Sequence, residues 1–78
     1  MSVFDQLGHV AMQAQEKGLI SKQLAERICR IGSDRLHYKH LGLELHGLVS
    51  QLAPAGGKAS ASSIETLVGQ IEDKHRRL

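Results

Sequence analysis

A regular run of apolar residues occupies positions 38 to 52, where they recur at intervals of three, four, three and four. The members of this seam are Tyr38, Leu41, Leu45, Leu48 and Leu52. The spacing places all five side chains on one side of an α-helix, whereas a half-buried strand needs strict alternation. No segment of the chain alternates in that way. We therefore expect an all-α fold.

Glycines and capping residues divide the chain into four predicted helices. Gly18 and Gly32 are expected to end the first two, because glycine tolerates the left-handed conformation that follows a helix. Residues that can cap a first turn stand at each start: Ser2, Ser21, Ser33 with Asp34, and Ser62 with Glu65 three positions later. The predicted helices cover residues 3–17, 22–31, 34–52 and 63–77.

Two details of the third predicted helix stay open. The second and third helices could form one rod through Gly32, but the apolar stripe changes phase after Ile31 and would place Arg35 in the seam. Gly42 and Gly47 interrupt the same segment, which indicates either a bend or the close approach of a neighbouring backbone. We expect separate helices and leave the role of these glycines open.

The chain has 78 residues and a single cysteine, Cys29. This length fits one domain, residues 1–78, with a flexible linker at 53–60 before the last helix. So short a domain buries only about 60% of the surface that its unfolded chain exposes. Cys29 has no partner for an internal disulfide that would compensate. We therefore expect dimerisation, or a partner protein, to complete the stability of the domain.

The sequence also predicts a compartment. No stretch approaches the ~20 apolar residues that span a bilayer, and the first residues lack the basic and apolar regions of a signal peptide. A lone thiol fits a reducing environment better than an oxidising one. These observations predict a cytoplasmic protein without membrane contact.

No motif for catalysis or for a cofactor is recognisable. Residues 56–58, Gly-Gly-Lys, lack the spacing of a phosphate-binding loop. His37, His40 and Glu44 share one side of the third predicted helix and suit zinc by their chemistry. A structural zinc ion needs four ligands, however, and one helix cannot surround it. We interpret these residues as a solvated face, and we expect no enzymatic activity, cofactor or metal.

Charge is distributed unevenly along the chain. Residues 17–40 contain six basic residues against two acidic ones, and residues 41–73 contain one basic residue against four acidic ones. Such asymmetry can steer an acidic partner or pair with a second copy of the chain. The candidate contact residues in the basic segment are Lys22, Arg27, Arg30, Arg35 and Lys39.

A short helical domain with an apolar seam and a basic segment is typical of proteins that recognise surfaces. The sequence therefore predicts a non-enzymatic protein-binding module: a stoichiometric inhibitor, an adaptor or a chaperone-like factor of bacterial or phage type. Its partner is expected to carry an acidic surface. The seam at 38–52 is the expected contact surface, with packing against the first and last helices as an equal alternative.

The second hypothesis is a small DNA-binding regulator that uses residues 14–30 as a helix-turn-helix. The small residue, turn glycine and apolar anchor of that motif are matched by Ala14, Gly18 and Leu24. Lys22 and Arg27 would lie in the recognition helix. Three positions that the motif keeps apolar are polar in this chain: Gln13, Lys17 and Arg27. Protein binding is accordingly the leading hypothesis.

Overall fold

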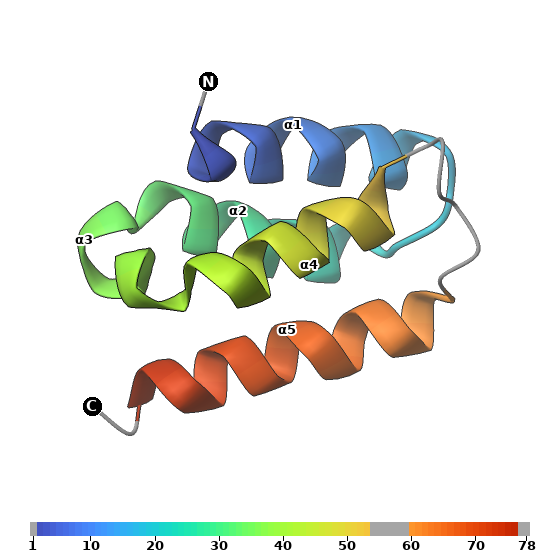
Figure 1. Cartoon of the computed structure of the whole chain (residues 1–78). Coiled ribbons are helices and arrows are strands. Elements are labelled where there is room, and N and C mark those ends of the chain that lie inside the picture. The colour runs from blue at the N-terminus through green and yellow to red at the C-terminus, as the bar shows by residue number, and fades with distance from the viewer. Residues whose placement is uncertain (1, 54–59, 77–78) are drawn as a thin grey trace.

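The computed structural model describes residues 2–53 and 60–76, which form four long helices (Figure 1). These are α1 (Val3–Glu16), α2 (Lys22–Ser33), α4 (Gly42–Leu52) and α5 (Ala61–Arg76), with a short α3 (Arg35–Tyr38) and a 3-10 turn, η1 (Lys39–Leu41), between α2 and α4. The described residues contain no strand, so the predicted all-α, four-helix fold is confirmed. The predicted linker at 53–60 lies outside the described residues, apart from its two ends.

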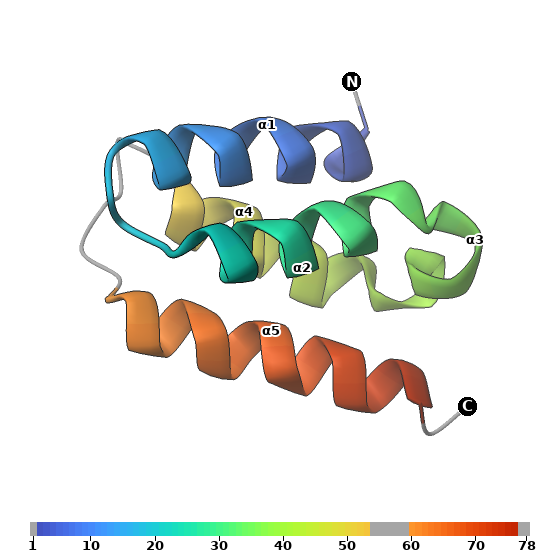
Figure 2. The same cartoon turned by 180° about the vertical axis from the view of Figure 1, so that it is seen from behind.

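Consecutive long helices run in opposite directions (Figure 1, Figure 2). α2 and α4 both lie between α1 and α5, with α4 in front of α2 in Figure 1 and behind it in Figure 2. α1 contacts both α2 and α4, and α5 contacts both α4 and α2. Each helix turns an apolar stripe inward, as amphipathic helices do in bundles. No helix in the described part of the chain combines the length and the apolar character needed to cross a membrane.

The first two helices begin at the predicted capping residues. The Ser2 hydroxyl accepts a hydrogen bond from the backbone N–H of Asp5 at 3.4 Å, and the Ser21 hydroxyl accepts one from Leu24 at 3.1 Å. Gly18 has a φ of +75°, which is the left-handed conformation predicted at the end of the first helix. Local capping therefore fixes the turn between α1 and α2.

The last helix begins earlier than predicted. The Ser60 hydroxyl accepts a hydrogen bond from the backbone N–H of Ser63 at 3.1 Å, so Ser60 caps α5 in place of Ser62. Ser62 lies inside the first turn, where its carbonyl oxygen accepts a hydrogen bond from the Thr66 hydroxyl at 3.0 Å. The helix therefore begins two residues before the approximate predicted start at residue 63, because three neighbouring serines offer alternative caps.

The predicted third helix, 34–52, is not continuous. α3 ends at Tyr38 and α4 begins at Gly42, and between them the φ angles of Tyr38 and Leu41 are −108° and −105°, outside the α-helical range. A bend next to Gly42, one of the two explanations left open above, is therefore observed. The bend helps to turn the chain back, so that α4 runs antiparallel to α2 (Figure 2).

α2 continues two residues beyond its predicted end, through Gly32 to Ser33. It stops at Asp34, whose φ and ψ of −109° and 61° separate α2 from α3 and rule out one continuous rod. The role of Gly32 is packing, because a Cβ atom there would lie 3.0 Å from the backbone oxygen of Phe4 in α1. A Cβ atom at Gly47 would meet nothing within 4 Å. Gly32 therefore permits the close approach of two helices instead of ending one.

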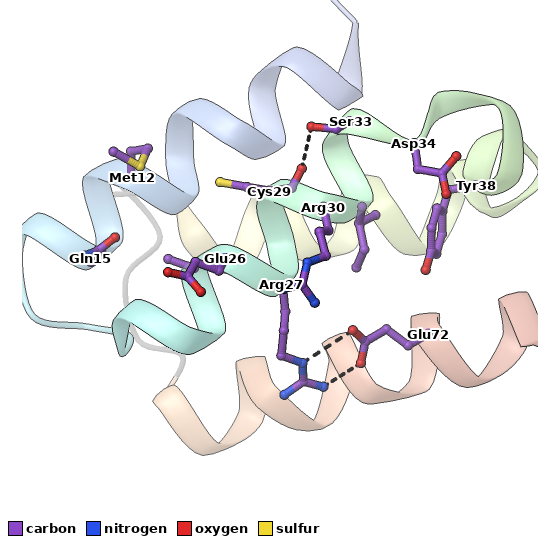
Figure 3. Close-up of a pocket in the computed structure, with 12 residues that line it drawn as sticks. Met12, Gln15, Glu26, Arg27, Cys29, Arg30, Ser33, Asp34, Tyr38 and Glu72 are labelled. Atoms are coloured by element: carbon purple, nitrogen blue, oxygen red, sulfur yellow. Dashed lines mark hydrogen bonds and ion pairs between the residues drawn. The ribbon is translucent and has the colours of Figure 1, made fainter.

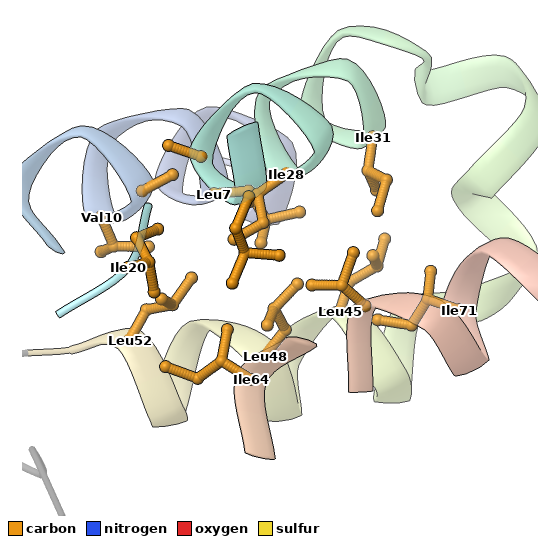
Figure 4. Close-up of a cluster of buried hydrophobic side chains, with 14 of the residues drawn as sticks. Leu7, Val10, Ile20, Ile28, Ile31, Leu45, Leu48, Leu52, Ile64 and Ile71 are labelled. Carbon is orange, nitrogen blue, oxygen red and sulfur yellow. The ribbon is translucent and has the colours of Figure 1, made fainter. Parts of the chain in front are cut away.

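The core is aliphatic and takes side chains from every long helix (Figure 4). Its largest fully buried members are Leu7, Ile28, Ile31, Leu45, Leu48, Leu52, Ile64, Val68 and Ile71. Among the described residues no polar or charged residue is buried, so no desolvated charge opposes this packing. Tyr38 is the single aromatic member of the described core.

The seam at 38–52 lies inside this core. All five of its side chains are at most 8% exposed: Tyr38, Leu41, Leu45, Leu48 and Leu52. In the single chain α4 packs on α1 and α5, which is the alternative that the spacing left open. A contact surface would need these side chains on the outside, so the seam does not enter the candidate site below. Dimerisation stays a prediction, which light scattering of the purified chain would test.

Candidate functional site

Two leucines outside the core are almost fully exposed. Leu36 in α3 is 78% exposed and Leu43 in α4 is 87% exposed, while Met12 in α1, the other large apolar residue exposed in the described chain, is 52% exposed. Each leucine precedes a buried seam residue, Tyr38 or Leu45, by two positions. Two helical positions correspond to a rotation of about 200°, so both leucines point away from the core.

The sequence beside these leucines contains one lysine and two histidines. Lys39 and His40 lie three and four positions after Leu36 and four and three positions before Leu43, and His46 follows Leu43 by three. All five side chains are exposed. Lys39, His40 and His46 form no ion pair or side-chain hydrogen bond with the described residues. We call these five residues, Leu36, Lys39, His40, Leu43 and His46, the leucine corner.

Both leucines hold apolar surface that a partner can bury. Complete burial of one leucine side chain is worth about 1.5–3 kcal/mol relative to full exposure. Neither Leu36 nor Leu43 is among the buried residues of the core, which come from every long helix. The leucine corner is therefore a place where contact with another apolar surface releases free energy.

An open groove of about 650 Å³ lies along the outer side of α2 (Figure 3). Residues of α1, α2 and α5 line it, among them Met12, Cys29, Arg30 and Glu72. The groove is open to solvent, so it lacks the enclosed, water-excluding surroundings of most ligand sites. We therefore place the candidate site at the leucine corner and not in this groove.

An ion pair beside the groove ties α2 to α5 (Figure 3). Arg27 Nη2 donates to Glu72 Oε1 at 2.6 Å, and Arg27 Nε donates to Glu72 Oε2 at 3.4 Å. Glu65 contributes a second carboxylate, 3.8 Å from Arg27. The hydrogen bond with Glu72 is the main cause that raises the pKa of Arg27. Arg27, predicted as a contact for a partner, thus holds the last helix in place.

Glu72→Gln is expected to lower the free energy of unfolding by about 1 kcal/mol, because it removes the charge of a pair whose side chains are only 32% and 23% exposed. Glu65→Gln is the matched control, since the Glu65 side chain is 67% exposed and its contact is longer. We expect less than about 0.3 kcal/mol there. Urea unfolding followed by circular dichroism measures both. Equal effects would contradict a specific role for Glu72.

The other predicted basic contacts do not share one face. Arg35 forms an ion pair with Asp5 of α1. Lys22 is the first residue of α2, whereas Lys39 lies in η1, beyond the other end of α2. Arg30 is exposed beside the groove. Of the five predicted residues, only Lys39 belongs to the leucine corner.

The last turn of α5 packs against the α3 end of the bundle. The ring centroids of Tyr38 and His75 are 4.5 Å apart, and Lys74 Nζ lies 3.1 Å from Glu44 Oε1 of α4. Burial is the main cause that raises the pKa of Tyr38, and the negative charge of Glu72 adds to it. The pKa of Glu44 is lowered, first by a hydrogen bond from its own backbone N–H and next by Lys74. Glu44, one of the acidic residues of the 41–73 segment, therefore pairs with Lys74 of the same chain.

Two of the three residues considered above for zinc pair with other side chains. His37 Nδ1 lies 2.6 Å from Asp34 Oδ1, and Glu44 pairs with Lys74. His40 is exposed. Within residues 2–53 and 60–76, no three His, Cys, Asp or Glu side chains gather as metal ligands would.

The α1–α2 hairpin differs from the DNA-binding arrangement. The two helices run antiparallel (Figure 2), whereas a helix-turn-helix sets them at about 90–120°. α2 is flanked by α1 and α5, and Arg27 is bound to Glu72. DNA binding stays a prediction, with Lys22 and Arg30 as its remaining exposed basic residues in α2.

The prediction from sequence omitted Leu36 and Leu43. Their separation of seven residues is itself a helical repeat, out of phase with the seam, and this signal could have identified them. No fold or sequence relative adds a further guide to the site. Comparison of the chain with protein-family models, with curated proteins and with solved structures finds no match.

Proposed function

We propose that the protein is a non-enzymatic, cytoplasmic protein-binding module that engages its partner through the leucine corner. The observation that carries this proposal is the exposure of Leu36 and Leu43, at 78% and 87%, beside Lys39. Exposed apolar residues rimmed by polar ones mark surfaces that contact other proteins. An inhibitor, adaptor or chaperone-like factor works in this way, by occupying a surface of its target.

The packing beneath the leucine corner supports this role. Tyr38, Leu41 and Leu45 alternate with the exposed residues and are all buried, which holds the backbone of α3, η1 and α4 in place. A surface whose backbone is already ordered loses less conformational freedom when it binds. The two leucines are therefore presented in a form ready for contact.

The test is capture of a partner from nuclease-treated extract by the tagged chain. We expect the wild type to retain a specific protein, and the Leu36→Glu, Leu43→Glu double variant to lose it. Met12→Glu is the matched control, because Met12 is exposed but belongs to α1, outside the leucine corner. It is expected to retain the partner.

The captured protein is then purified and the complex is reconstituted, with circular dichroism confirming that every variant is folded. A wild-type chain that retains no specific protein contradicts the proposed function. Binding that disappears with nuclease and falls steeply with added salt would favour the DNA-binding hypothesis, because phosphate contacts release counterions.

A further inference from the structure

The outer side of α2 is covered by no other helix of the described chain. Figure 2 shows α2 in front of α4, with α1 and α5 on either side. α2 is one unbroken α-helix, so residues four apart in it lie on the same side, one turn after another. Lys22, Glu26 and Arg30 are exposed on this outer side. The buried residues of α2 face the opposite way: Leu24, Ala25, Ile28 and Ile31.

Charges of alternating sign follow this outer side at intervals of four residues. Lys22 and Arg30 are positive, and Glu26, midway between them, is negative. Asp34, the C-cap of α2, adds a second negative charge four residues after Arg30. Glu26, Arg30 and Asp34 also line the same groove, so the structure places these three on one surface (Figure 3).

Glu26 and Arg30 have no partner inside the described chain. Opposite charges four residues apart on a helix can pair, yet neither side chain forms an ion pair or a side-chain hydrogen bond with the described residues. Arg27 and Glu72, which line the same groove, are bound to each other, as the dashed lines of Figure 3 show. Glu26 and Arg30 can therefore pair with a second molecule without breaking an existing contact.

This charge pattern is complementary to itself when the helix direction is reversed. A two-fold axis that passes midway between Glu26 and Arg30 brings a second α2 alongside in antiparallel orientation. Glu26 then faces Arg30 of the second copy, and Arg30 faces its Glu26. The same axis places Lys22 opposite Asp34 of the second copy. A parallel arrangement would bring like charges together, which disfavours it.

Apolar surface lies beside these charges. The groove of about 650 Å³ along α2 and a second open groove of about 610 Å³ between α1 and α2 share Met12, Cys29 and Ser33. Met12 is 52% exposed, and Cys29 is half-buried. Exposed ion pairs alone add little to binding, so an interface also needs apolar contact. Met12 can supply that contact next to the charged row.

A strongly charged partner suits this surface poorly. The groove along α2 is lined by two positive residues, Arg27 and Arg30, and by three negative ones, Glu26, Asp34 and Glu72. Such a balance gives little attraction for the phosphate backbone of a nucleic acid or for a highly acidic protein. A surface that carries both signs in a self-complementary order favours a second copy of the chain.

From this order of charges we infer that the protein forms a homodimer in which the two α2 helices pack against each other in antiparallel orientation. Glu26 pairs with Arg30 of the second copy in two equivalent contacts, and Met12 is buried beside them. The inference goes beyond the proposed function, because it uses a surface other than the leucine corner. The dimer carries two leucine corners, one from each copy.

Sedimentation velocity of the purified, full-length chain tests whether the dimer exists. We expect a reversible monomer–dimer equilibrium with a dissociation constant on the order of 10–100 µM, since one methionine and a row of exposed charges make a modest interface. A chain that stays monomeric up to about 1 mM overturns the inference.

Charge reversal tests which surface forms the dimer. Arg30→Glu and Glu26→Arg each place like charges together at two symmetric contacts, so each is expected to weaken dimerisation at least about tenfold. The double variant Glu26→Arg, Arg30→Glu exchanges the two charges and keeps the row self-complementary. It is expected to restore the dissociation constant to within about threefold of the wild type. A double variant as weak as the single ones overturns the antiparallel pairing.

Two controls lie outside α2. Lys39→Glu makes the same charge change as Arg30→Glu but in η1, and it is expected to leave dimerisation within about twofold of the wild type. The Leu36→Glu, Leu43→Glu double variant is expected to dimerise like the wild type. A dimer that this double variant abolishes would assign the interface to the leucine corner, and that result overturns the inference. Circular dichroism confirms that every variant is folded.

The proposed function and this inference fail separately. A monomeric chain that still captures a partner through the leucine corner would leave the protein-binding role intact and refute the dimer. If Arg30→Glu instead abolishes capture of that partner, the outer side of α2 belongs to a different protein, and the inference is again overturned. A dimer whose leucine corner captures nothing would refute the proposed function alone.

Discussion

Leu45→Ala is expected to lower the free energy of unfolding by about 3 kcal/mol, the usual cost of truncating a fully buried leucine. Leu43→Ala, two residues earlier in the same helix, is expected to change it by less than about 0.5 kcal/mol. Leu45 is 0% exposed and Leu43 is 87% exposed, so the substitutions remove the same atoms from opposite surroundings. The difference between them measures burial alone.

Urea unfolding followed by far-ultraviolet circular dichroism gives both values. A domain of this size has little stability to lose, so the Leu45 variant is expected to be partly unfolded at moderate temperature. Similar losses in both variants would mean that Leu43 is buried in solution, for example in a dimer. That result would also remove the basis for placing a binding surface at the leucine corner.

Gly32→Ala is expected to destabilise the protein by about 1–2 kcal/mol, although alanine is the better helix former by about 1 kcal/mol. The added Cβ atom would lie 3.0 Å from the Phe4 backbone oxygen, and a backbone atom cannot move aside as a flexible side chain can. Separating α1 from α2 to relieve the contact would loosen the packing of Leu7, whose Cβ lies 3.6 Å from the same point.

Gly47→Ala is the matched control for this substitution. Both glycines are helical, but a Cβ atom at Gly47 meets nothing within 4 Å. We expect this variant to be more stable by about 0.5–1 kcal/mol, because alanine restricts the unfolded chain without strain in the folded one. Unfolding midpoints of the two variants should therefore move in opposite directions. A stabilising Gly32→Ala would show that α1 and α2 are not as close as described.

Local signals in the sequence predicted the local parts of the fold. Ser2, Ser21 and Gly18 set the ends of α1 and the start of α2 through contacts within three residues or through a backbone angle. Gly42 left a bend open as one of two alternatives, but the apolar spacing runs through the break between Tyr38 and Gly42 without interruption and could not decide between them. Core packing needs Tyr38 and Leu41 inward whether the backbone is α-helical or bent, so periodicity alone does not reveal the bend.

The candidate site was harder to predict, because an apolar stripe identifies a face and not its partner. The seam at 38–52 is the most regular stripe of the chain, yet α1 and α5 cover it. The sequence also does not show which charged residues pair within the chain. Arg27 and Glu72 are 45 residues apart, and only the fold brings them together. Leu36, Leu43 and Lys39 stay exposed because neither the core nor the ion pairs of the described residues include them.

Tyr38 gives this protein a spectroscopic reporter of its own. It is the sole tyrosine, and the chain has no tryptophan, so tyrosine emission arises from a single side chain. That ring is buried where α3 meets the last turn of α5, with the ring of His75 centred 4.5 Å away. Departure of the α5 end would remove this neighbour and admit water to the phenol. The emission can therefore follow detachment of the last helix separately from loss of total helicity, with no label attached.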